Sequence, residues 1–198
     1  MNRGIVLTDT TLELASRLQA DLDSETAARH QLVETAWSTG VGVGLISFES
    51  KTETLFMGEQ AQRRPVTGVI PALNGYQDGR CAYCDVHMRR GVMPPQVEHV
   101  LPFVLKARGW HSYDVDQLWN LVLACRDCNA AKSGRAPHAD WMPWLVTRNE
   151  DLIASRHPLR DTLIKQTGTT YSEREQFLLG AYREATTKLP SVWTPAKN

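Results

Sequence analysis

Two C-x-x-C pairs supply the residues of this chain best suited to hold a metal ion. Cys81 and Cys84 form the first pair, Cys125 and Cys128 form the second, and the sequence contains no other cysteine. Four thiolates in two such pairs are the ligands of a tetrahedral zinc site, and four unrelated cysteines would rarely fall at this spacing. Because four thiolates leave no coordination position for water, we expect this zinc to be structural.

Polar residues suited to phosphodiester hydrolysis lie in the 40 residues between the pairs and just after them. Glu98 and His99 stand within an apolar, strand-like sequence, and Asn120 opens a second one. Asn129 and Lys132 follow the last cysteine at a spacing that places both on one helix face. A neutral histidine suits a general base near pH 7. Carboxylate and amide oxygens suit a hard cation such as Mg²⁺.

The order of these parts resembles the HNH nuclease family, which is built on the ββα-metal fold. The resemblance is carried by C-x-x-C from Cys81, Glu-His-Val-Leu-Pro from Glu98, Asn-Leu-Val-Leu from Asn120 and Cys-x-x-Cys-Asn-x-x-Lys from Cys125. It covers about a quarter of the chain. The sequence departs from the commoner family pattern at Glu98, where Asp is more frequent. It also has asparagine in place of the last histidine, a variant that the family uses.

The resemblance implies a role for each matching residue. His99 would be the general base, Glu98 and Asn129 would hold the catalytic Mg²⁺ or Mn²⁺, and Asn120 would tie the adjoining loop and orient the histidine. A plain loop-ending asparagine is the alternative for Asn120. Five basic residues would contact DNA phosphates or, alternatively, be solvated surface charges: Arg63, Arg64, Arg89, Arg90 and Lys132.

One geometric condition applies to the proposed catalytic pair. Successive side chains of a β-strand point to opposite faces. Glu98 and His99 can therefore serve the same phosphate only near the end of a strand or in a distorted segment, and Pro102 makes a strand end plausible there.

Two classes of function fit these residues. The first is a metal-dependent endonuclease that cuts double-stranded DNA, either as a restriction-type enzyme or as the cutting subunit of a bacterial phage-defence system. The second is a zinc-stabilised DNA-binding or scaffold subunit without catalysis. The joint presence of Glu98, His99 and Asn129 favours the first. A neutral chain with additional helical segments also predicts a companion protein, such as an ATPase or helicase.

Charge is unevenly distributed along a chain whose formal net charge is zero. Residues 1–60 hold 4 basic and 9 acidic side chains, whereas residues 61–135 hold 10 basic and 6 acidic ones. The basic excess therefore coincides with the motif, as phosphate binding requires.

Neither a signal pattern after Met1 nor an apolar run of about 20 residues is present. We therefore expect a cytoplasmic protein without a membrane span, in which paired cysteines favour zinc over disulfides. Two disulfides in a secreted protein are the alternative.

The elements that would position these residues predict an α+β, mainly helical fold in three parts. Residues 1–62 are expected to form helices over 9–38 and a hairpin pairing 45–48 with 54–57. Residues 63–137 form the HNH module, with antiparallel strands at 97–101 and 121–124, a short helix from Asp127, and a helix over 63–76 bent at Pro71. Residues 138–198 form a helical lobe whose tail around Trp193 folds back.

Overall fold

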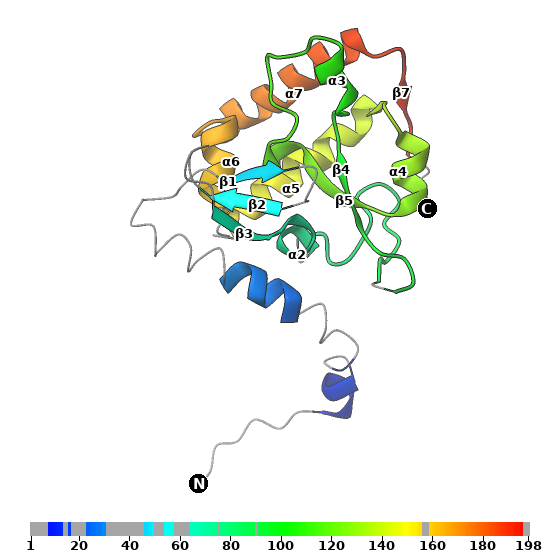
Figure 1. Cartoon of the computed structure of the whole chain (residues 1–198), viewed down its shortest axis with the longest axis vertical. Helices are drawn as coiled ribbons and strands as arrows, with labels where there is room; N and C mark the ends of the chain where they lie inside the picture. The colour runs from blue at the N-terminus through cyan, green and yellow to red at the C-terminus, as the bar shows by residue number, and fades with distance from the viewer. Residues whose placement is uncertain are drawn as a thin grey trace.

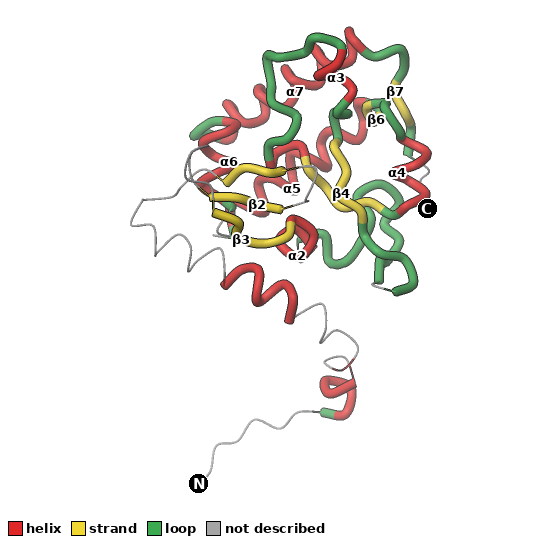
Figure 2. The backbone as a smooth tube through the Cα atoms, viewed as in Figure 1, coloured by secondary structure: helices red, strands yellow, loops and turns green. Residues whose placement is uncertain are grey.

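The computed structural model describes residues 8–13, 16, 23–30, 46–49, 54–57, 64–74, 76–89, 91–155 and 159–195. Within these residues the fold is α+β, which confirms the predicted class. Figure 1 shows small sheets beside the C-terminal helices, and Figure 2 shows how much of the intervening chain is loop. Residues 9–13, 16 and 23–30 are helical. The other residues of the helix predicted over 9–38 lie outside the described ranges.

A three-stranded antiparallel sheet precedes the cysteine segment. Strands β1 (Ile46–Glu49) and β2 (Thr54–Met57) pair as the sequence predicted, and β3 (Arg64–Gly68) adds to the other edge of β2. The prediction of a helix from residue 63 is therefore wrong at its start, because Arg64–Gly68 pairs with the open edge of β2 as a strand. The helix α2 (Val69–Asn74) begins only afterwards.

Pro71 lies in the first turn of α2. It is the third residue of the helix, where a backbone N–H has no intrahelical acceptor, so the missing N–H costs no hydrogen bond.

A second hairpin lies at the centre of the molecule. Strand β4 (Gln96–His99) runs antiparallel to β5 (Leu121–Ala124), and the helix α4 (Arg126–Lys132) follows directly. The predicted order of strand, strand and helix is confirmed. The first strand ends at His99, two residues earlier than expected. All four residues of β5 are buried, so this strand runs through the core.

The loop between β4 and β5 packs by its aromatic side chains. It contains the helix α3 (Val104–Ala107) and the 3-10 turn η2 (Leu118–Asn120). Trp110 is buried and stacks on Tyr113, with ring centroids 5.3 Å apart. Tyr113 in turn meets the edge of Phe177 at 5.1 Å. These contacts anchor the loop to the C-terminal helix that carries Phe177.

Three helices that pack on one another follow the hairpin, as predicted for the C-terminal segment. They are α5 (Met142–Ala154), which follows the turn η3 (Ala139–Trp141), α6 (Arg160–Thr167) and α7 (Tyr171–Lys188). A capping box between Thr170 and Glu173 starts α7. Among the described residues, no helix combines the length and apolarity needed to cross a membrane.

The tail folds back onto the cysteine segment, as predicted. Strand β7 (Val192–Trp193) pairs in parallel with β6 (Ala136–Pro137), and Trp193 meets Tyr83 edge-on at 5.0 Å. Buried apolar side chains from Val69 to Trp193 form a single cluster. Residues on both sides of position 137 contribute to this cluster.

Candidate functional site

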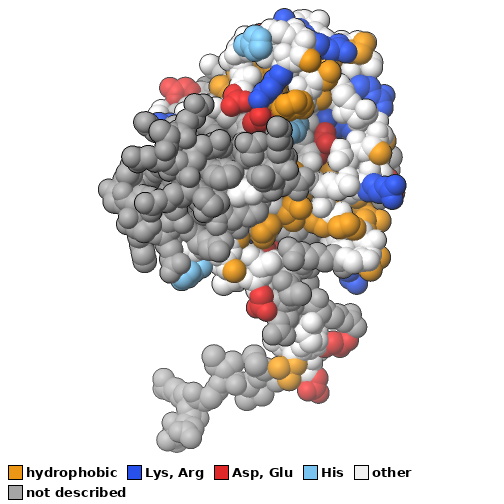
Figure 3. Space-filling model, in the orientation of Figure 1, with side chains coloured by type: hydrophobic (Ala, Val, Ile, Leu, Met, Phe, Trp, Pro, Cys, Tyr) orange, Lys and Arg blue, Asp and Glu red, His pale blue; other side chains and the backbone are white. Residues whose placement is uncertain are grey.

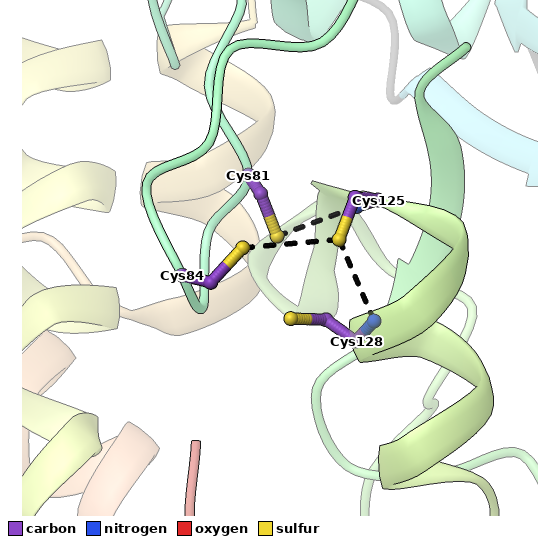
Figure 4. Close-up of side chains that lie close together, drawn as sticks. All are labelled: Cys81, Cys84, Cys125 and Cys128. Atoms are coloured by element: carbon purple, nitrogen blue, oxygen red, sulfur yellow. Dashed lines mark hydrogen bonds between the residues drawn. The ribbon is translucent and has the colours of Figure 1, made fainter. Parts of the chain in front are cut away.

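The four cysteines converge on one point (Figure 4). Their Sγ atoms all lie within 4.8 Å of one another, and Cys84 Sγ is 3.8 Å from Cys125 Sγ. A disulfide needs about 2.05 Å, so this pair is not bonded. A tetrahedral zinc with Zn–S bonds of about 2.3 Å spaces its sulfurs by about 3.8 Å. The donor set therefore fits a metal ion such as zinc.

Backbone N–H groups point at the sulfurs. Cys125 donates to Cys81 Sγ over 3.3 Å, Tyr83 donates to the same atom over 3.5 Å, and Cys128 donates to Cys125 Sγ over 3.5 Å. Burial opposes ionisation of Cys81, but these backbone hydrogen bonds outweigh it and lower the pKa of the thiol. Metal ligation needs the thiolate, and these backbone hydrogen bonds favour it at Cys81, whereas burial raises the pKa of the Cys84 and Cys128 thiols.

Gln77 ties the first knuckle to the hairpin, a role that no sequence motif announced. Its side chain accepts from Leu123 N and donates to Leu123 O, each over 2.7 Å, on the edge of β5 that β4 does not use. It also donates to Arg80 O over 3.0 Å. The chain that carries Cys81 is thereby fixed to the strand that leads to Cys125.

One face of β4 is directed at α4. Gln96 Oε1 accepts from Asn129 Nδ2 over 2.9 Å, and the carboxylate of Glu98 is bound by Lys132 Nζ. Gln96 and Glu98 are alternate strand residues, while Asn129 and Lys132 are one helical turn apart, so two rows of polar contacts join strand to helix. The predicted metal ligands Glu98 and Asn129 therefore both lie where β4 faces α4.

Lys132 is buried, which corrects the prediction that it contacts phosphate. None of its surface is exposed, and Nζ donates to Glu98 and, over 2.8 Å, to the carbonyl oxygen of His99. Burial lowers the pKa of Lys132 against the attraction of Glu98. Burial likewise raises the pKa of Glu98, and the nearby Lys132 ammonium limits that rise. Lys132 thus binds groups inside the protein, at the end of β4.

His99 faces the other side of β4 and contacts a residue that the sequence did not single out. Its Nε2 lies 2.9 Å from Asp116 Oδ1, and Lys106 Nζ lies 2.6 Å from Asp116 Oδ2. Burial opposes ionisation of Asp116, but hydrogen bonds from His99 and Lys106 outweigh it and lower its pKa to about 2. The histidine therefore rests against a carboxylate that is ionised at neutral pH. Phe103 lies beside it, with ring centroids 5.9 Å apart.

Asn120 holds the loop that carries Asp116. It is fully buried, accepts from Leu101 N over 2.8 Å, and donates to Leu101 O and Val115 O over 2.9 Å each. Leu101 follows His99 by two residues, and Val115 precedes Asp116. One amide thus fixes the chain on both sides of the His99–Asp116 contact. These hydrogen bonds tie the loop to the residues that follow β4.

Glu98 and His99 do point to opposite faces, as their alternation in a strand requires. The sequence allowed both side chains to serve one phosphate only near the end of a strand, and β4 does end at His99. Lys132 contacts the side chain of one and the backbone of the other. Glu98 and His99 are therefore neighbours along the chain, but their side chains point in different directions.

The predicted phosphate-binding arginines are only partly described. Arg89 is exposed at a tight turn, and Arg64 lies in β3. Arg63 and Arg90 lie outside the described residues. On the face drawn in Figure 3, Lys and Arg side chains lie in separate places with acidic side chains among them.

Comparisons with protein-family models, with curated proteins and with solved structures found no match to this chain. The resemblance to HNH nucleases therefore stays a hypothesis that rests on the motif residues of this sequence.

Proposed function

We propose that this protein is a metal-dependent endonuclease of the HNH type that hydrolyses phosphodiester bonds in DNA. The observation that carries the proposal is the placement of the motif residues on one hairpin and its following helix. Glu98 and His99 are the last two residues of β4, and Asn129 lies on α4. The four-cysteine cluster joins the start of α4 to the segment before β4 that carries Cys81 and Cys84.

In this proposal His99 takes the proton of the attacking water. The ionised Asp116 beside it stabilises the positive charge that the ring gains, and Asn120 keeps the two residues in register. General-base catalysis contributes about 10²–10⁴-fold to a rate. His99 is thus the residue on which cleavage should depend most.

Glu98 and Asn129 would hold the catalytic Mg²⁺ or Mn²⁺ in this proposal. Such a hard cation supplies neutralisation of the charge that develops on the phosphate and on the leaving oxygen. Asn129 uses Nδ2 for its contact with Gln96, so its oxygen is not engaged in that hydrogen bond. Burial raises the pKa of Glu98, and the contact with Lys132 at Oε1 opposes that rise and so favours the carboxylate form that a cation requires.

Double-stranded DNA is the substrate we propose, and a companion protein such as an ATPase or helicase would deliver it. The scattered basic side chains on the face in Figure 3 and the neutral net charge support dependence on a partner. A restriction or phage-defence system is the setting that such a cutting subunit would suit.

A second function is favoured by one observation, the ion pair between Glu98 and Lys132. A carboxylate already neutralised by a buried ammonium could serve stability alone, in a zinc-stabilised DNA-binding or scaffold subunit without catalysis.

Plasmid cleavage separates the two functions. A nuclease should nick or linearise plasmid with Mg²⁺ and lose this activity in EDTA. The Asn129→Ala variant should cleave more slowly than wild type, and part of the activity should return at high Mg²⁺ or with Mn²⁺. Gln96→Ala is the matched control, because it removes the hydrogen-bond partner of Asn129 and keeps the proposed ligand. DNA binding without cleavage under all these conditions would favour the scaffold.

A further inference from the structure

The contact between His99 and Asp116 determines which ring nitrogen carries the proton. Asp116 is ionised at neutral pH, and an ionised carboxylate can only accept hydrogen bonds. Its Oδ1 lies 2.9 Å from Nε2, so Nε2 must be the N–H donor. In a neutral imidazole the other nitrogen, Nδ1, then carries the lone pair.

Lys106 fixes the carboxylate that makes this choice. Its Nζ lies 2.6 Å from Oδ2 of Asp116 and 3.4 Å from Oδ1 of Asp114. Each oxygen of Asp116 therefore faces a different donor: Oδ1 faces the histidine and Oδ2 faces the lysine. Both side chains in the contact are largely shielded, with 16% of His99 and 19% of Asp116 exposed.

We infer that Asp116, held by Lys106, is a positioning residue that fixes His99 in the tautomer protonated on Nε2 and leaves Nδ1 as the proton-accepting nitrogen. The tautomer itself does not depend on the activity of the protein. Its catalytic consequence rests on the proposed nuclease function, in which Nδ1 would take the proton of the attacking water.

An asparagine at position 116 should reverse the tautomer, because a side-chain amide has one accepting and one donating end. Lys106 can only donate, so the amide oxygen should face Lys106 and the NH₂ group should face His99. Nε2 would then have to accept, and the proton would move to Nδ1. Removing Lys106 as well should let the amide rotate, so that its oxygen again accepts from Nε2.

The test is the tautomer of His99, read from two-bond ¹H–¹⁵N correlations of the imidazole in zinc-loaded protein. Spectra are recorded at about pH 8.5, about two units above the ordinary histidine pKa, and the His99 signals are identified by their loss in His99→Ala. We expect Nε2–H in the wild type, Nδ1–H in Asp116→Asn, and Nε2–H again in the Lys106→Met, Asp116→Asn double variant.

Two variants keep the test independent of folding defects. Lys106→Met alone should retain Nε2–H, as should Asp114→Asn, which alters the same loop but leaves the oxygen that accepts from Asp116 N. Backbone amide spectra establish that each variant is folded. Nδ1–H in the wild type, or an unchanged Nε2–H in folded Asp116→Asn, would overturn the inference.

Cleavage supplies a separate readout. If the proposed function holds, Asp116→Asn should lower single-turnover cleavage on the order of 10²–10⁴-fold, as holding a base in the wrong tautomer can do. The double variant should recover to the rate of Lys106→Met. Tautomers as expected with no cleavage by any form would refute the nuclease proposal and leave the role of Asp116 in positioning His99 intact. A purely structural Asp116 would alter stability in Asp116→Asn without reversing the tautomer.

Discussion

Lys132 binds the carboxylate of Glu98 from inside the protein, with none of its own surface exposed. The same ammonium donates to the carbonyl oxygen of His99 over 2.8 Å. A single buried cation therefore contacts both residues of the Glu-His pair. It links α4 to the end of β4, where the proposed chemistry takes place.

Replacing Lys132 with methionine should lower the free energy of unfolding by about 3–5 kcal/mol, because Glu98 would be left buried without its partner. Arg126→Met is the matched control, since Arg126 is exposed on the same helix and should change stability by no more than about 0.5 kcal/mol. Urea unfolding followed by tryptophan fluorescence measures both. Equal losses for the two variants would show that the ion pair contributes nothing to stability.

Replacing Asn120 with alanine should cost about 3 kcal/mol or more, because three backbone groups of Leu101 and Val115 lose their buried partner. Asn149→Ala provides the comparison. Asn149 is also buried, and among the described residues its side chain makes one hydrogen bond, to Trp119 O over 3.2 Å. Chemical denaturation should rank Asn120→Ala well below Asn149→Ala in stability, and the reverse order would contradict the tying role.

Tyr83→Phe should leave stability at pH 7 nearly unchanged, because the buried Tyr83 hydroxyl has no hydrogen-bond partner among the described residues. Burial also raises the pKa of Tyr83 well above 10, so the folded protein keeps a proton that the unfolded chain loses. The stability that the protonated Tyr83 phenol contributes is fully present below about pH 10 and is lost as pH rises further.

Unfolding measurements from pH 8 to 11 should therefore show a shallower alkaline loss in Tyr83→Phe than in wild type. Tyr171→Phe, at an exposed tyrosine, controls for removal of a phenol. Identical alkaline slopes for wild type and Tyr83→Phe would mean that the phenol is not buried as the structure places it.

Zinc should be present at one ion per chain, held by four sulfurs at about 2.3 Å in X-ray absorption. Removing it with a chelator should destabilise the whole described core by several kcal/mol, because the cysteine segment and the C-terminal helices share one apolar cluster. Cys128→Ser should have the same effect. A properly folded protein without bound metal, or with fewer sulfur ligands, would remove this part of the account.

Local patterns in the sequence were enough to predict the hairpin, the following helix and the metal cluster. The C-x-x-C pairs fix their own chemistry by spacing, and the apolar run before Cys125 has the length of one buried strand. The strand at Arg64–Gly68 was missed for a physical reason. Its pairing depends on the open edge of β2, which no local pattern reveals, and the spacing of Val66, Val69 and Ile70 also fits a helix.

The partners inside the candidate site were harder to predict. Asp116 is 17 residues from His99, and nothing in the sequence between them signals the contact. Lysine is seldom fully buried, so Lys132 was expected at the surface. Burial and pairing of this kind depend on how the β4–β5 loop and α4 close over the strand.

The most direct test of the proposed nuclease is single-turnover cleavage of double-stranded DNA by wild type and His99→Ala, in Mg²⁺ and in EDTA, with any companion protein supplied. His111→Ala is the matched control, because His111 is an exposed histidine on the loop that follows β4. The account predicts Mg²⁺-dependent cleavage by wild type and His111→Ala, and a loss of about 10²–10⁴-fold in His99→Ala with zinc content unchanged. Equal rates for wild type and His99→Ala would contradict it.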